Sequence, residues 1–367
     1  MVNTAENAYR PDYVVTPGEV LAYELELRQM SQAELAKRTG LTQKHINAIV
    51  KTKGKAVITP ETALKLERSI GMPVNYWLNL EAYYQETQAR LAETTRLEED
   101  LDWLKKIPVA AMAQLGWLDK HRDKKDQLAE VLRFFGIASV AQWADMWPKL
   151  TVAYRQHGNQ AICPEAVSAW LRQGEREAAR IECAAFDKAR FRTALDRVRD
   201  LTAEQKPERF VPAMKSLCAA AGVAVVFVPA LPKTGVSGAT RWVHPDKAVI
   251  QLSLRYKTND HLWFTFFHEA GHIYLHGKKA LFIEGGNGLD EAKEVEANQF
   301  AEHELIPKQA FAAFADRSPW SKAAIVAFAR DIKLAPGVVV GRLQHKGLLP
   351  HTHCNDLKVR YQWANGL

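Results

Sequence analysis

The residues best suited to chemistry in this 367-residue chain lie in one oily segment that contains His268-Glu269-Ala270-Gly271-His272. Residues four apart project from the same face of a helix, so the two imidazoles can converge on one metal ion. A zinc ion held by three protein ligands keeps a water molecule whose proton is easily lost, and Glu269 is placed to accept that proton as general base. The pattern predicts a hydrolytic zinc centre on a buried helix. Two buried histidines that are merely satisfied by hydrogen bonds are the alternative.

A third metal ligand must come from another segment. His276 lies about 12 Å along the helix axis from His268, at 1.5 Å per residue, which is too far for a shared ion. A second helical pattern, DEAKEVEANQFAEHELIP, follows after a loop. Two helices packed across that loop would bring one carboxylate to the histidines, and we expect Glu296 to be this ligand. Glu294 lies about 200° away around the helix and is expected to face solvent.

The segments around this motif change from helical to strand-like patterns. VAVVFVP, SGATRWV and KAVIQLSL are β-branched runs bounded by Gly, Pro and Asp, which predict three strands. We expect Asn259 or Asp260 to cap the motif helix, and Gly271 to let another backbone approach it closely. The predicted fold class is mainly α with an α+β zinc-peptidase domain, in which a small mixed sheet packs on the HExxH helix.

Capping residues divide the amino-terminal region into five helices. Thr16 and Ser31 each precede a glutamate by three residues, and Thr42 and Thr59 are suited to cap two further helices. A fifth helix is expected to begin near Pro73. Two of these helices are joined by a short turn that contains a glycine, and the second starts with polar residues. This arrangement predicts a helix-turn-helix.

The charge distribution favours DNA as the partner of this region. The net charge of the whole chain is only +7, but six basic residues and no acidic one lie between residues 37 and 59. Phosphate contacts need such local asymmetry. We expect amide and ammonium side chains at the start of the third helix to read base edges, and the lysines that follow to meet phosphates. The alternative is a helical bundle with a solvated basic face. The predicted DNA-binding residues are Gln32, Thr42, Gln43, Lys44, Asn47, Lys51, Lys53 and Lys55.

The middle of the chain carries no visible chemistry. It is rich in Leu, Ala, Arg and Glu and reads as several helices. Its tryptophans at 103, 117, 143, 147 and 170 are expected to be core residues and not a ligand platform. The predicted organisation is a helix-turn-helix domain at 1–90, a helical linker or interaction region at 91–212, and a metallopeptidase domain at 213–367.

Cysteine usage and hydropathy set further limits. The four cysteines, at 163, 183, 218 and 354, form no CxxC pair, which argues against a disulfide framework or a thiolate zinc knuckle. The first residues lack a signal-peptide pattern, and no apolar run approaches the roughly 18 residues of a membrane span. We expect a cytoplasmic protein.

Two resemblances extend this interpretation. The stretches SQAELAKRTG, ITPETALKLE and YWLNLEAYYQ make residues 14 to 90 similar to the HigA antitoxin branch of the XRE helix-turn-helix family. That resemblance implies operator binding as a homodimer through the amino-terminal domain, and a toxin as a further candidate partner.

The second resemblance covers residues 213 to 350. FHEAGHIYLHG, EVEANQFAEHELIP and ARDIKLAPGVVVGRLQHKGLLP resemble the ImmA/IrrE metallopeptidases. The resemblance implies one Zn²⁺ bound by His268, His272 and Glu296, with Glu269 as base, and cleavage of a helix-turn-helix repressor. His345 or Arg342 could stabilise the oxyanion, and the sequence selects neither.

The leading hypothesis is a DNA-binding regulator with zinc-dependent endopeptidase activity. Its expected substrate is a partner repressor or antitoxin in a stress, mobile-element or toxin-antitoxin system. One alternative is an antitoxin or repressor whose peptidase domain is catalytically silent. Another is a peptidase toxin that a separate antitoxin restrains.

Overall fold

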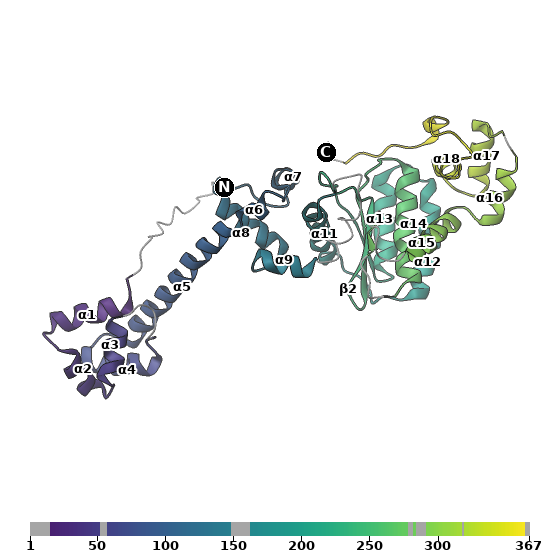
Figure 1. Ribbon diagram of the computed structural model, residues 1–367. Helices are drawn as coiled ribbons and strands as arrows, with labels where there is room; N and C mark the ends of the chain where they lie inside the picture. Colours follow the sequence, from purple (N-terminus) through teal and green to yellow (C-terminus); the bar gives the residue numbers. More distant parts are fainter. Residues whose placement is uncertain are drawn as a thin grey trace. The chain divides into compact units, whose positions relative to one another are not determined.

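The structure, a computed structural model, describes residues 15–51, 57–147, 162–277, 282–283, 291–317 and 319–363. It divides into two compact units, Met1–Leu101 and Asp102–Leu367, which we describe separately (Figure 1). Within the described ranges, no helix is both long and apolar enough to span a bilayer.

The first unit is built from five helices whose ends follow the predicted caps. The Thr16 hydroxyl accepts a hydrogen bond from the backbone N–H of Glu19, and Ser31, Thr42 and Thr59 cap the next three helices in the same way. Such caps satisfy backbone donors that have no partner within the helix. The helices are α1 (Pro17–Leu27), α2 (Gln32–Thr39), α3 (Gln43–Val50), α4 (Pro60–Ile70) and α5 (Val74–Glu99).

One apolar core holds these helices together, and its largest fully buried side chain is Trp77 of α5. Two polar contacts also connect separate segments of this unit. The Arg28 guanidinium donates to the carbonyl of Ile70, and the buried Glu81 carboxylate accepts from the backbone N–H of Ile58 at 3.1 Å. The fifth helix begins next to Pro73 as predicted, and it continues for 26 residues.

The second unit contains the remaining helices and a single sheet. Its helices before the sheet are α6 (Leu101–Leu104, which starts at the unit boundary), α7 (Val109–Gln114), α8 (Lys124–Phe135), α9 (Val140–Met146), α11 (Pro164–Ala179), α12 (Lys188–Asp200), η1 (Leu201–Ala203) and α13 (Pro207–Ala219). Those after the third strand are α14 (Asn259–Leu275), α15 (Glu291–Leu305), α16 (Lys308–Ala315), α17 (Lys322–Asp331), α18 (Pro336–His345) and η2 (Asn355–Leu357).

The sheet has the mixed topology and the three strands expected from the sequence. The strands β1 (Val223–Phe227) and β3 (Lys247–Leu252) pair in parallel, and β2 (Gly238–His244) pairs with β3 antiparallel. A fourth strand of two residues, β4 (Phe282–Ile283), was not predicted and adds to β2 to give the order β1-β3-β2-β4. The predicted fold class is confirmed.

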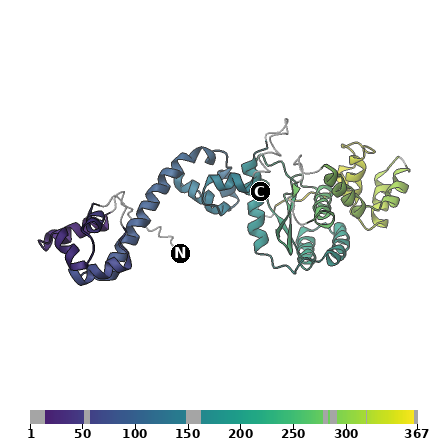
Figure 2. The same cartoon turned by 60° about the horizontal axis from the view of Figure 1, so that its bottom comes forward.

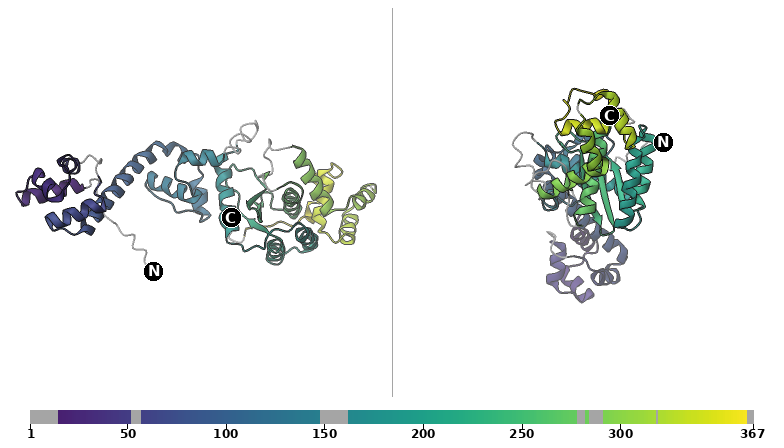
Figure 3. Two further views of the ribbon diagram at one scale, coloured as in Figure 1. Left: turned by 90° about the horizontal axis from the view of Figure 1, so that it is seen from below. Right: turned by 90° about the vertical axis from the view of Figure 1, so that its right-hand side faces the viewer.

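Helices cover both faces of this sheet (Figures 2 and 3). On one face, Val225 and Ile250 belong to the core shared with α12, α13 and α14. On the other face lies α11, whose Trp170 indole donates to the carbonyl of Val228 and whose Trp170 carbonyl accepts from Gln251. Because both faces are buried, β1 is a continuous apolar run, and β3 is apolar from Ala248 to Ile250 before Gln251.

The middle of the chain is helical, as predicted, in the parts that the structure describes. All five of its tryptophans are at most 9% exposed, which confirms that they are core residues. Helices α12 and α13 contribute Phe191, Phe210 and Met214 to the core beneath the sheet. The division into three domains at 90 and 212 stays a prediction.

Candidate metal centre and nucleic-acid interface

The HExxH motif lies on α14, the most deeply buried helix around the sheet. The helix begins at Asn259 with Thr258 as N-cap residue, and no side chain caps it. The prediction that Asn259 or Asp260 is the cap was therefore wrong. The Asn259 side-chain oxygen instead accepts a hydrogen bond from the backbone N–H of Val359, which fastens the carboxy-terminal segment to the helix.

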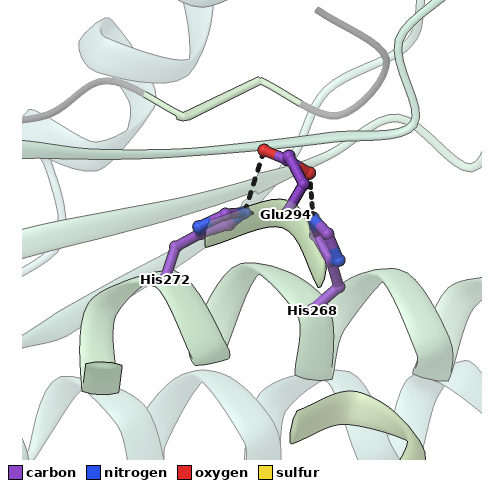
Figure 4. Close-up of side chains that lie close together, drawn as sticks. All are labelled: His268, His272 and Glu294. Carbon is purple, nitrogen blue, oxygen red and sulfur yellow. Dashed lines mark hydrogen bonds and ion pairs between the residues drawn. The ribbon is translucent and has the colours of Figure 1, made fainter. Parts of the chain in front are cut away.

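Two imidazoles and one carboxylate meet on the face of α14 toward α15 (Figure 4). The Nε2 atoms of His268 and His272 lie 3.1 Å apart. The carboxylate of Glu294 reaches both, with one oxygen 3.3 Å from His268 Nε2 and the other 3.4 Å from His272 Nε2. Both histidines are almost fully buried. The ligand atoms of these three residues all lie within 4.8 Å of one another, close enough to bind one metal ion, and no other such group occurs among the described residues.

The packing of α15 on α14 explains why Glu294 takes this place. Ala297 and Ala301 are fully buried, and the Cα of Ala297 would lie only 3.3 Å from a Cβ at Gly271. The predicted close approach at Gly271 is confirmed. A residue three positions before Ala297 and seven before Ala301 shares their face of the helix, and that residue is Glu294.

The expectation for the two glutamates was therefore wrong. The side chain of Glu294 is 31% exposed and faces the histidines, whereas that of Glu296 is 60% exposed. Glu296 lies on a different face of α15, because it is the residue next to Ala297 and successive residues are about 100° apart around the helix. Glu296 forms an ion pair with His276. Among the described residues it forms none with His268 or His272.

A second layer of side chains fixes the orientation of the two motif histidines. His268 Nδ1 lies 3.0 Å from the Asn298 side-chain oxygen, and His272 Nδ1 lies 3.0 Å from His276 Nδ1. His276 Nε2 is in turn 3.0 Å from a Glu296 oxygen. Because amide and carboxylate oxygens only accept, these contacts put protons on Nδ1 of both motif histidines. Their Nε2 lone pairs then face Glu294, which is the tautomer that a metal ligand needs.

The electrostatics favour the same protonation states. Burial alone would raise the pKa of Glu294, but its close contacts with His268 and His272 outweigh burial and lower this pKa to about 2. Burial lowers the pKa of His272, with a smaller opposing effect from Glu294. Near neutral pH the carboxylate is therefore ionised and the imidazole neutral, and these are the forms that bind a metal ion.

Glu269 is fully buried beside this cluster, next to the sheet. A Cβ at Gly238 would lie 2.6 Å from its Oε1, so only glycine fits at the start of β2. The Thr240 hydroxyl donates to the carbonyl of Glu269 at 3.0 Å and anchors this turn of α14 to β2. No sequence pattern indicates this role for Gly238, because a glycine at a strand end most often marks a turn.

The predicted DNA-binding residues lie around α3 of the first unit. Ile46 and Ile49 of α3 are buried in the core, which leaves the opposite side of the helix to the polar residues. Lys53 and Lys55 lie outside the described residues. Of the others, Thr42, Gln43, Lys44 and Lys51 are exposed, and Gln32 and Asn47 are half-buried.

Comparisons with known families agree with both regions. The helix-turn-helix family model matches residues 21–77, and the model of the IrrE N-terminal-like domain, a peptidase M78 family, matches residues 218–344. No curated protein matches the chain.

Among solved structures, the chain is similar to an addiction module antidote protein of a HigA family from Coxiella burnetii. The two are 34% identical, the match covers 23% of this chain and 92% of the other, and the TM-score is 0.21. A helix-turn-helix DNA-binding domain beside a peptidase-type domain is the composition of a regulator. The chain therefore contains two domains: residues 21–77 form an XRE-type helix-turn-helix domain, and residues 218–344 form an ImmA/IrrE-like peptidase domain.

Proposed function

We propose that the protein is a DNA-binding regulator that cleaves a partner protein with a zinc-dependent endopeptidase centre. The observation that carries this proposal is the Glu294 carboxylate, which lies 3.3 and 3.4 Å from the two Nε2 atoms of the HExxH motif. Two neutral imidazoles and one carboxylate are the donor set of many catalytic zinc sites, and such sites keep one position open for water or substrate.

The donor set fits a zinc ion in its chemistry and in its support. Each imidazole is oriented by a side chain of the second layer, Asn298 for His268 and the His276–Glu296 pair for His272. Such outer partners fix the tautomer and raise the basicity of the ligands. When bound, zinc supplies Lewis acidity that polarises a peptide carbonyl and eases the loss of a proton from water.

Glu269 is the residue that moves the proton. Its buried carboxylate takes a proton from the attacking water, while the water oxygen forms a bond to the carbonyl carbon of the substrate. The carbon–nitrogen bond then breaks, and Glu269 delivers the proton to the leaving amine. Gly238 and the anchored turn at Thr240 hold the Glu269 side chain and backbone beside the sheet.

The sheet edge next to Glu269 offers a place for an extended substrate. β4 forms this edge, and it pairs with β2, whose first residue touches Glu269. An extended segment that adds to an edge strand gains main-chain hydrogen bonds whatever its sequence. We propose that a repressor or antitoxin segment binds here, while a homodimer holds operator DNA through α3. A toxin is a further candidate partner.

The test is Glu269→Gln in the full chain. Candidate substrates are proteins of the native host that are cut when the wild type is present and intact when the variant replaces it. For any one of them we expect kcat/KM to fall by about 10²- to 10⁴-fold, which is the usual contribution of a general base. Zinc content, measured by elemental analysis, should stay at one ion per chain. Undiminished cleavage by the variant would disprove the role of Glu269.

The similarity to an antidote protein supports a second candidate function. In that reading the protein is an antitoxin or repressor, and its peptidase domain is catalytically silent. The two candidate functions differ in whether they require zinc, because a catalytically silent domain that only binds a partner does not need the metal. A purified protein without stoichiometric zinc, and with no change in any host protein, would favour the second candidate.

A further inference from the structure

A pocket of about 390 Å³ lies beside the metal centre, between α14, α15 and α18. Its walls include the apolar side chains of Phe264, Leu305 and Val338. Its polar lining includes Glu302, Arg342 and His345. Pockets of this size hold a small ligand or one large side chain with its backbone.

The pocket is joined to the metal centre through two of its lining residues. Asn298 lines the pocket and also holds His268 Nδ1 at 3.0 Å. Phe264, one turn before His268 on α14, lies with its ring centroid 6.3 Å from that of His268 and equally far from that of His345. A substrate residue close to the scissile bond can therefore reach the pocket with its side chain.

Four charged residues line the pocket, and two of them, Asp260 and Lys358, pair with each other at 2.6 Å. The other two, Glu302 and Arg342, form a cluster with Lys346, which lies just outside the lining. Glu302 forms an ion pair with Arg342 and lies 3.2 Å from the Lys346 ammonium group, so two cations share one carboxylate. The Arg342 guanidinium lies over the Phe311 ring, which limits how far it can move. Its Nε is buried and has no hydrogen-bond partner among the described residues. The cluster carries one net positive charge and a donor without an acceptor.

Burial lowers the pKa values of three groups in this region, and neighbouring positive charges add to the effect at two of them. The pKa of His345 is lowered by burial first, and then by repulsion from Lys346, Arg342 and His351. Burial, with a smaller contribution from Arg342, also lowers the pKa of Lys346. Burial lowers the pKa of Arg342 to about 10. The cationic form of each of these groups would be stabilised by an additional negative charge in the pocket.

We propose that this pocket is a specificity site that binds an acidic side chain, Asp or Glu, of the polypeptide substrate. The apolar walls accept the methylene groups, and Arg342 pairs with the carboxylate, while Lys346 beside Glu302 adds positive charge from outside the lining. An acidic side chain satisfies the guanidinium and balances the charge of the Glu302, Arg342 and Lys346 cluster, whereas a basic one would meet the Arg342 cation. The inference rests on the proposed function, because it assigns a side chain to the substrate of that centre.

Peptide binding to a variant that does not cleave the peptides tests whether the pocket prefers an acidic side chain. The probes are two fluorescent decapeptide libraries that are randomised except for one central residue, which is Glu in one and Gln in the other. Binding to the full-length Glu269→Gln protein is followed by fluorescence anisotropy. We expect the Glu library to bind about tenfold more tightly, which is the usual effect of one charge-assisted hydrogen bond. Equal affinity for the two libraries would overturn the proposal.

Three variants in the Glu269→Gln background locate the effect. Arg342→Gln should abolish the preference for Glu, and Lys346→Gln, at a residue that is more exposed, should reduce it without the risk of unfolding the protein. Arg330→Gln removes an exposed cation on α17 outside the pocket and should change nothing. A preference for Glu that survives both Arg342→Gln and Lys346→Gln would show that the acidic residue binds at another site. Displacement of the Glu library by free glutarate at low millimolar concentration would assign the pocket to a small dicarboxylate instead.

The wild type then separates this proposal from the proposed function. If the wild type cuts the libraries but cleaves Glu and Gln peptides equally, the peptidase assignment stands and the pocket assignment fails. If the Glu library binds selectively but is not cut by zinc-loaded wild type, the pocket stands and the peptidase assignment fails for these sequences.

Discussion

Helices α3 and α14 each carry the polar residues of a candidate site, but they hold them in opposite ways. In α3 only Ile46 and Ile49 are buried, and the residues expected at DNA lie toward solvent. In α14 the histidines and Glu269 are buried with most of the helix, and their partners come from α15 and β2. An exposed binding helix is specified by its own caps and apolar positions. A buried centre is specified by how neighbouring elements pack against it.

The largest expected effect tests whether packing selects the third ligand. Glu294→Gln removes the carboxylate that reaches both imidazoles, while Glu296→Gln, two residues away, changes only the second layer. We expect Glu294→Gln to weaken zinc binding by more than about 100-fold, because loss of a second-layer partner alone usually costs 10- to 100-fold. Competition with a chromogenic chelator measures the affinities. The reverse ranking of the two variants would restore Glu296 as ligand.

The second layer supplies the next prediction. Asn298→Ala removes the acceptor of His268 Nδ1, and His276→Ala breaks the connection from His272 to Glu296. Each should weaken zinc binding about 10- to 100-fold while the domain stays folded, because each leaves a motif histidine without its orienting partner. The same chelator assay and a thermal unfolding curve separate this effect from unfolding. His303→Ala, at an exposed residue of α15 outside the cluster, is the control.

The sequence predictions succeeded where a feature depends on nearby residues, and they failed where it depends on the packing of separate elements. The caps at Thr16, Ser31, Thr42 and Thr59 act over three residues, so the sequence could place the helices of the first unit. The HExxH spacing is equally local. The choice between Glu294 and Glu296 depends on which face of α15 meets α14, and that face is set by contacts between residues far apart in the sequence.

A signal for Glu294 was nevertheless present. Ala297, Ala301 and Leu305 are small or apolar residues at four-residue steps, and all three are buried. Glu294 lies three residues before Ala297 and seven before Ala301, which are spacings that keep it on the same helix face. The motif histidines do not show which face of α15 meets them. The two-residue strand β4 and the contact of Gly238 with Glu269 left no comparable pattern, since both are consequences of tertiary packing.

The DNA interface allows a prediction of intermediate size. Gln43→Ala and Lys44→Ala remove exposed side chains at the start of α3 without touching its buried face. If these side chains read bases, each variant should weaken operator binding by about tenfold and leave binding to random DNA nearly unchanged. Fluorescence anisotropy with both DNAs at one salt concentration is the measurement. Lys65→Ala, on α4 and paired with Glu61, is a charge-matched control for Lys44→Ala. An equal loss on both DNAs would mean phosphate contact.

The smallest expected effect compares a cap in each region. Thr42→Ala removes the acceptor for the backbone N–H of His45 in α3, and Ser321→Ala removes the acceptor for that of Ala324 in α17. Each substitution should lower the free energy of unfolding by about 1 kcal/mol. If the two units unfold separately, calorimetry will show that Thr42→Ala shifts one transition and Ser321→Ala the other. A shift of both transitions by either variant would show that the units unfold together. In that case the stability of α3 would depend on packing elsewhere in the chain as well as on its own cap. Helices α3 and α14 would then differ only in how much they depend on such packing.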